Sequence, residues 1–417
     1  MKLGKYSFGV GDRFGHQARA QLEAFILAKN HGVTITPVWN KSFREHQLIG
    51  SKPDDVRKAA DRAVRALGWK DSYFVDADHI GMKNIDFFLD SSDFFTIDVA
   101  DFIGQPVDAK KQALFVEQHR RYLGSIEIPG IAEPLIITRE RIESIASKYL
   151  AAIEAAGKIY AYIFSKKDGD NWVVEVSMDE TSSPQTPVEL LFILAGLANR
   201  EIPVATIAPK FSGRFNKGID YIGDLDRFAI EFAQHLAVIR FAIDEFSLPR
   251  DLKLSVHSGS DKFSIYPLIR NALVQFDAGV HLKTAGTTWL EELIGLAEAG
   301  GEGLALAKGI YRSAWERFEE LCAPYAAVVD IDRGKLPQPF EVDRWDEERF
   351  ATTLRHHVDH PNYNPHFRQL LHVAYKIAAE LGDRYLEALD RYEAEITRNV
   401  TTNIFERHIK PIFLAQD

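Results

Sequence analysis

Eight short β-rich segments that alternate with helical patterns are the strongest constraint on what this chain can fold into. The predicted strands cover residues 6–11, 33–39, 72–78, 94–100, 172–177, 202–209, 252–258 and 279–285. Stretches such as "HQARAQLEAFILAKN" and "PVELLFILAGLANR" lie between them and repeat apolar residues at helical spacing, and Asp224 is the expected N-cap of a further helix. Strands alternating with helices indicate parallel βαβ units, so the sequence predicts an α/β fold, a TIM-type (β/α)8 barrel. The glycines of "GVGDRFGHQ" lack the spacing of a dinucleotide-binding turn, which disfavours a doubly wound sheet.

Two parts of the chain exceed a bare barrel. Residues 101–145 are expected to form an insertion after the fourth strand. Residues 303–417 read as a mainly helical extension that packs on the barrel or lines a homo-oligomer interface. The predicted catalytic barrel domain therefore spans residues 1–302.

Composition excludes several classes of function. The formal net charge of −10 argues against nucleic acid as a partner, because a phosphate-binding surface needs a basic excess. No apolar run is long enough to span a membrane, and no signal segment begins the chain, so we expect a cytoplasmic protein. The single cysteine, Cys322, excludes an intrachain disulfide and a cysteine-cluster metal site.

Polar side chains gather where the predicted strands end, which is where a TIM barrel carries its catalytic groups. These residues are Asp12, Arg13, Asp76, Asp78, His79, Glu175, Ser177, Asp179, Lys210, His257, His281 and Lys283. Because a purely structural barrel could end its strands in apolar residues, the pattern predicts an active site.

Three of these residues, His79, His257 and His281, form a natural ligand set for one divalent cation such as zinc, manganese, nickel or cobalt. A carboxylate could take the place of His281 in this set. Glu175 interrupts the apolar strand "WVVEV", so it needs a partner such as Lys210 or Lys283.

A second histidine-rich segment, "LRHHVDHPNYNPHFRQLLH", lies in the C-terminal extension. Its spacing matches no zinc-binding pattern, and Pro361 and Pro365 favour a loop. We expect these histidines to lie in a solvated or interface-lining loop.

Seven ordered motifs resemble the tagaturonate epimerase family, which interconverts D-tagaturonate and D-fructuronate. They are "FGVGDRFGHQ", "FVDADHIG", "VEVSMDETSSP", "KGIDYIGDL", "SVHSGSDKFSIYP", "VHLKTAGTTWLEE" and "RQLLHVAYK", and together they cover nearly the whole chain. More distantly, "DADH" and "HSGS" resemble motifs of class II aldolases. That resemblance implies His79 and His257 as metal ligands and Asp78 as a group that transfers protons.

The resemblance implies a sugar acid as the small-molecule substrate. Its epimerised carbon, C3, is not adjacent to the C5 ketone, which favours retro-aldol cleavage and re-addition over simple enolisation. The expected catalytic pair is Asp78 as base and Glu175 as acid. The predicted substrate-binding residues are Asp12, Arg13, Lys210, Ser258 and Lys283, and the N–H groups of a helix starting near Ser264 would face a substrate anion.

Three alternatives remain open at this point. A ketose 4-epimerase acting on fructose and tagatose would need the same site without a carboxylate contact. A class II-type sugar aldolase would share the metal site but release a three-carbon aldehyde. A barrel that only binds a sugar acid would give no reason for three strand-end histidines.

Overall fold

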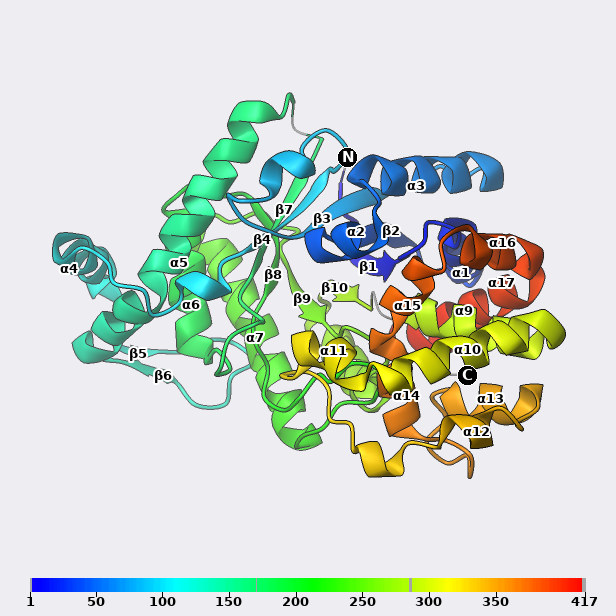
Figure 1. Ribbon diagram of the computed structural model, residues 1–417. Helices are drawn as coiled ribbons and strands as arrows, with labels where there is room; N and C mark the ends of the chain where they lie inside the picture. The colour runs from blue at the N-terminus through cyan, green and yellow to red at the C-terminus, as the bar shows by residue number, and fades with distance from the viewer. Residues whose placement is uncertain (1, 170, 285–286, 415–417) are drawn as a thin grey trace.

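Eight parallel strands close into a barrel in this computed structural model, which describes residues 2–169, 171–284 and 287–414 (Figure 1). The strands follow the order β1-β10-β9-β8-β7-β4-β3-β2 around the barrel. They are β1 (Tyr6–Gly11), β2 (Ile35–Ser42), β3 (Phe74–Ile80), β4 (Phe94–Asp98), β7 (Val173–Ser177), β8 (Val204–Ala208), β9 (Lys253–His257) and β10 (Val280–Lys283). The predicted TIM-type barrel is therefore confirmed; residue 285, the last of the final predicted strand, lies outside the described residues.

The helices of the barrel and the segment between β4 and β7 follow the order of the chain. These elements are α1 (Ala18–Asn30), α2 (Phe43–Ile49), α3 (Pro53–Leu67), α4 (Ala109–Gln118), β5 (Gly124–Ile126), β6 (Leu135–Ile137), α5 (Arg139–Lys166), α6 (Pro187–Ala198), α7 (Leu225–Phe246), α8 (Tyr266–Phe276) and α9 (Thr287–Glu298). Local sequence sets their ends: Asp224 caps α7 as predicted, by accepting from the N–H of Arg227, and Thr186 and Glu189 form a capping box on α6. None of the described helices is long and apolar enough to cross a membrane.

The segment after β4, predicted as an insertion, contains α4 and the antiparallel hairpin of β5 and β6 before the long helix α5. In Figure 1, α4, β5 and β6 lie at the edge of the molecule opposite the C-terminal helices. These elements thus extend the barrel on the side away from the helical extension.

The chain beyond α9 is helical and packs against α1 and α9 (Figure 1). Its helices are α10 (Gly301–Glu316), α11 (Phe318–Cys322), α12 (Pro339–Val342), α13 (Glu347–Leu354), α14 (Pro365–Val373), α15 (Tyr375–Glu380), α16 (Asp383–Arg391), α17 (Glu393–Thr402) and α18 (Lys410–Phe413), with a π-helical turn over Asn403–Ile409. Trp289 of α9 donates to the carbonyl oxygen of Leu371 at 2.7 Å, and Tyr385 donates to Glu292 at 2.9 Å. Buried polar contacts therefore join the extension to the barrel.

The histidine-rich segment departs in part from the expected solvated or interface-lining loop, because His357 is exposed in a loop whereas other histidines are buried. His356 and His372 are buried, at 1% and 0% exposure, and Pro365 starts α14 instead of breaking a helix. His356 contacts the carboxylate of Asp261 through Nδ1 at 3.0 Å, and Arg368 contacts the same carboxylate at 2.7 Å. Because Asp261 follows β9 in the chain, this cluster fastens the loop after β9 to the extension.

Candidate active site

A cavity of about 810 Å³ opens at the carboxyl ends of the barrel strands. Most of the residues predicted from the strand ends line it. These are Arg13, Asp78, His79, Asp179, Lys210, His257 and Lys283. The predicted residues outside its lining are Asp12, Asp76, Glu175, Ser177, Ser258 and His281. The structure therefore brings together side chains from six strand ends, as the sequence predicts.

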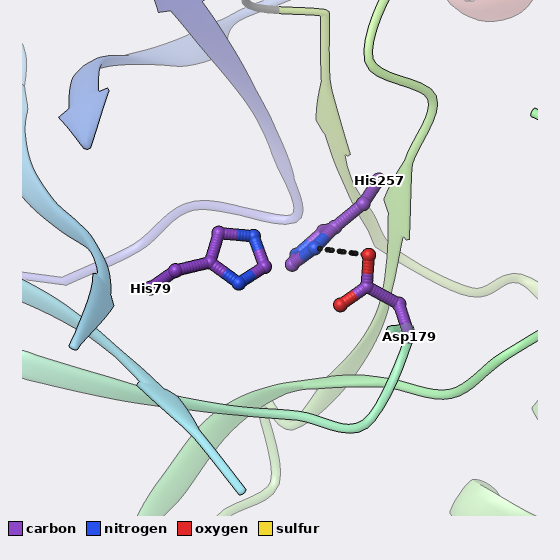
Figure 2. Close-up of side chains that lie close together, drawn as sticks. All are labelled: His79, Asp179 and His257. Carbon is purple, nitrogen blue, oxygen red and sulfur yellow. Dashed lines mark ion pairs between the residues drawn. The ribbon is translucent and has the colours of Figure 1, made fainter. Parts of the chain in front are cut away.

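His79, His257 and Asp179 form a group in which one ligand atom from each residue lies within 4.8 Å of the others (Figure 2). Figure 2 shows the two imidazole rings and the carboxylate facing a common space, with an ion pair of 3.2 Å between His257 Nδ1 and Asp179. Two imidazole nitrogens and a carboxylate oxygen suit a divalent transition metal. Asp179 is thus the carboxylate that the sequence allowed in place of His281.

A carboxylate holds the other ring nitrogen of each histidine. His79 Nδ1 lies 2.9 Å from Asp98, and His257 Nε2 lies 2.7 Å from Glu175. This leaves His79 Nε2 and His257 Nδ1 toward the common space, where the carboxylate of Asp179 lies 3.2 Å from His257 Nδ1. Metal-ligating histidines typically donate their second nitrogen to a carboxylate in this way, so these residues fit a metal ion.

The backbone of β3 explains how adjacent residues can serve one cavity. Neighbouring strand residues normally point to opposite faces, but the pairing of β3 with β4 shifts register between Ala77 and Ile80. His79 lies in this irregularity with a φ of 53°, in the left-handed region. The bend lets both Asp78 and His79 line the cavity.

The charges of the site favour a cation. Burial opposes the charged form of His257, but Asp179 and Glu175 raise its pKa to about 9. Burial likewise opposes the charge on His79, and Asp78 holds the pKa of that histidine well above its ordinary value. The surrounding carboxylates thus bind positive charge, whether on imidazolium or on a metal ion.

Lys283 lies at the centre of a buried ion cluster beneath the cavity. Its Nζ lies 2.7 Å from Asp76, 2.9 Å from Asp78 and 3.2 Å from Glu175, and it donates to Thr96 at 2.6 Å. The predicted salt bridge between Glu175 and Lys283 is therefore present. With these carboxylates around it, Lys283 is not the free cation expected to bind a substrate carboxylate.

Glu175 does not suit the predicted role of proton donor to the substrate. It is fully buried beneath His257, outside the cavity lining, and accepts a hydrogen bond of 2.6 Å from Thr206. Burial alone would raise its pKa, but Lys283 and His257 hold the pKa well below its ordinary value. The contacts make Glu175 a positioning residue for His257.

The structure does not bring His281 to the group of His79, His257 and Asp179, the candidate metal-binding group. His281 and Lys283 share a face of β10, but Lys283 pairs with His257 whereas His281 pairs with Ser255, one level deeper in the barrel. His281 Nδ1 lies 2.9 Å from the hydroxyl of Ser7, and burial lowers the pKa of the imidazole to about 3. Alternation along β10 correctly predicted that His281 faces the same side as Lys283. It could not predict how far His281 lies below the carboxyl end of the barrel.

Three other expected substrate contacts are used within the fold. Asp12 holds the turn that precedes α1 by accepting from the N–H groups of Gly15 and Gln17, both at 2.7 Å. The hydroxyl of Ser258 donates to the carbonyl oxygen of Lys283 at 2.6 Å. The N–H of Ser264, expected to face a substrate anion, donates instead to Asp220 at 3.1 Å.

The strand-end pattern did not predict several residues that line the cavity. Arg44 follows the end of β2, where the rule used for the other strands could have found it, and Lys217 lies within the "KGIDYIGDL" motif. Glu180 also lines the cavity, next to Asp179. Tyr325 comes from the C-terminal extension, and no local pattern linked it to the barrel.

Comparison with known proteins places these features in a family. The model of the tagaturonate epimerase family matches residues 1–412. A tagaturonate/fructuronate epimerase from Thermotoga maritima is 29% identical over 419 residues, covering 97% of this chain and 80% of that protein. The glycerol-complexed crystal structure of a fructuronate-tagaturonate epimerase from Cohnella laeviribosi is 25% identical with a TM-score of 0.80, covering 98% of this chain and 81% of that one; its native form gives a TM-score of 0.78. Because the match extends over almost its entire length, the chain belongs to the tagaturonate epimerase family and is an isomerase.

Proposed function

We propose that this chain is a metal-dependent epimerase that interconverts D-tagaturonate and D-fructuronate by retro-aldol cleavage and re-addition. The observation that carries the proposal is the group of His79, His257 and Asp179, whose histidines are held by Asp98 and Glu175 in a cavity large enough to admit a sugar acid. The relatives from Thermotoga maritima and Cohnella laeviribosi, named for this reaction, support the choice of substrate.

The two substrates differ at C3, and the ketone is at C5. The C3 hydrogen is not acidified by the ketone, so loss and return of a proton at C4 would leave C3 unchanged. Breaking the C3–C4 bond solves this problem, because its electron pair moves into the C4–C5 enediolate and C3 becomes an aldehyde carbon. The aldehyde then turns over and the bond re-forms on its other face.

Two carboxylates are available for proton transfer. Among the carboxylates lining the cavity, Glu45 contacts Arg13, Asp98 holds His79 and Asp179 belongs to the metal-binding group. The remaining two are Asp78 and Glu180. Asp78 takes the proton of the C3 hydroxyl, and Glu180 returns a proton to the oxygen after the aldehyde has turned.

A bound divalent ion would supply Lewis-acid stabilisation of negative charge on the ketone oxygen. His79, His257 and Asp179 would hold that ion, while Glu175 keeps the ring of His257 in orientation. Lys283 keeps the carboxylate of Asp78 in place from below at 2.9 Å.

Elemental analysis of purified protein, paired with an epimerisation assay before and after chelation, tests this proposal. We expect activity to disappear with the metal and to return when it is added back, and His79→Ala to lose metal while exposed His31→Ala keeps it. Full activity in metal-free protein would contradict the metal-dependent mechanism. Net formation of a three-carbon aldehyde by the unmodified enzyme would favour the aldolase alternative.

A further inference from the structure

Three cations that line the cavity, Arg13, Arg44 and Lys217, lie over the rings of a pair of tyrosines. The guanidinium carbon of Arg13 lies 4.2 Å from the ring centroid of Tyr375, and that of Arg44 lies 4.7 Å from the ring of Tyr325. The amine of Lys217 lies 5.5 Å from the Tyr325 ring. The two tyrosine hydroxyls are joined by a hydrogen bond of 2.7 Å, so the helical extension organises all three cations.

The cations exceed the anions that contact them. Arg13 donates to Glu45 at 3.1 Å. Neither Arg44 nor Lys217 forms an ion pair or side-chain hydrogen bond with any residue that the structure describes, although both line the cavity. Lys217 is half-buried, so its charge costs free energy that an anionic ligand would offset, and Arg44 lies exposed beside it at the cavity.

Lys217 is fixed relative to the metal-binding group. Its backbone N–H donates to the carbonyl oxygen of Val328 in the extension at 2.8 Å. The next residue, Gly218, donates to the hydroxyl of Ser260 at 2.9 Å, three residues beyond His257. The lysine is therefore tied to the extension on one side and to the loop of a predicted metal ligand on the other.

We infer that Arg44 and Lys217 form an anion-binding subsite that holds the carboxylate of a sugar acid. The inference rests on the proposed function for the identity of the substrate. Lys217 supplies a point charge, and Arg44 offers a planar fork that matches a carboxylate, with Tyr325 supporting both. The carboxylate lies at the end of the substrate remote from the ketone, so the subsite and the metal-binding group hold opposite ends of one molecule.

This arrangement has a consequence for the reaction. When the C3–C4 bond breaks, the carboxylate stays on the three-carbon aldehyde fragment, which must turn without leaving. An anchor on that carboxylate retains the fragment until the bond re-forms. The subsite therefore separates an epimerase from an aldolase that shares the same bond-breaking chemistry.

The test compares Lys217→Met and Arg44→Met with the conservative Lys217→Arg and with Lys110→Met, an exposed control on α4. Inhibition and thermal shift are measured with D-gluconate and with D-glucitol, which differ in having a carboxylate or a hydroxymethyl group. We expect each Met variant to weaken gluconate binding by about 10- to 100-fold and to leave glucitol unchanged. Both variants should also release more three-carbon aldehyde per epimerisation event, and Lys217→Arg should restore retention in part.

Equal binding of gluconate and glucitol by the unmodified protein would overturn the inference, as would unchanged gluconate binding in both Met variants. A protein that selects gluconate through these residues but does not epimerise D-tagaturonate would instead refute the proposed function and leave the subsite intact. If Lys217→Met does not fold, Arg44→Met provides the same comparison.

Discussion

Replacing Glu175 with glutamine separates positioning of His257 from direct catalysis. The carboxylate accepts from Thr206 at 2.6 Å, lies 2.7 Å from His257 Nε2 and pairs with Lys283 at 3.2 Å. Glu175→Gln preserves the size of the side chain, but the amide is neutral and has a single acceptor oxygen. The substitution therefore weakens the hold on His257 without opening a cavity.

The loss of stability expected for Glu175→Gln depends on which carboxylate partners Lys283 keeps. Asp76 and Asp78 remain at 2.7 and 2.9 Å, so its charge stays compensated. The loss corresponds to a charge-assisted hydrogen bond, about 1.5–3 kcal/mol, and not to the about 3–5 kcal/mol of stranding a buried charge. The affinity for metal should fall by about 10- to 100-fold, because Glu175 orients a ligand.

Denaturant unfolding of the metal-free protein measures the first quantity, and metal titration measures the second. Turnover is then followed as a function of metal concentration, with exposed Glu143→Gln on α5 as the control. We expect saturating metal to restore most of the activity of Glu175→Gln. Unchanged metal affinity combined with a loss of about 10²- to 10⁴-fold in turnover at saturating metal would refute this reasoning and make Glu175 a proton-transfer group.

Three further predictions concern other residues. Asp78→Asn should retain metal and lose about 10²- to 10⁴-fold in turnover, measured together with metal stoichiometry; activity that returns with added metal would contradict its role as base. Asp261→Asn should lower the free energy of unfolding by about 3–5 kcal/mol in chemical denaturation, because it leaves the buried Arg368 uncompensated, and a loss below about 1 kcal/mol would count against this. Burial lowers the pKa of His46 and of His235 to about 4, so the unfolded chain takes up protons from about pH 6.5 downward while the folded chain does not; stability should fall between about pH 6.5 and 4 by up to about 3 kcal/mol per histidine. Unfolding curves of a His46→Gln, His235→Gln double variant across that range should show a shallower slope than the unmodified protein, and an equal slope would disprove the assignment.

The sequence was sufficient for the barrel and for two of the three residues in the candidate metal-binding group. Apolar alternation located the strands, and the rule that barrel chemistry lies at strand ends brought His79 and His257 together. It could not choose between His281 and a carboxylate as the third member. Depth in a barrel depends on register between strands, and that register is a long-range property that no single strand encodes.

Local sequence patterns also could not predict which residues of the C-terminal extension contact the barrel, because these contacts are long-range. Tyr325 and Tyr375 reach the barrel mouth across hundreds of residues of sequence and contact cations near the chain start. Asp12 shows the opposite error, because a polar residue after a strand can hold the following turn through its backbone N–H groups instead of facing the cavity. Strand-end polarity thus identifies candidates, and the three-dimensional contacts decide among them.

The left-handed backbone at His79 narrows the choice of amino acids at that position. Apart from glycine, the residues that adopt this conformation most readily are asparagine, aspartate and histidine, whereas β-branched residues are strongly disfavoured. Aspartate, asparagine and histidine also place a metal-ligating atom a short distance from the backbone. The backbone conformation and the coordination chemistry therefore favour the same three residue types at position 79. Replacing His79 with aspartate or asparagine would change the ligand atom offered to a metal without changing the conformation of β3.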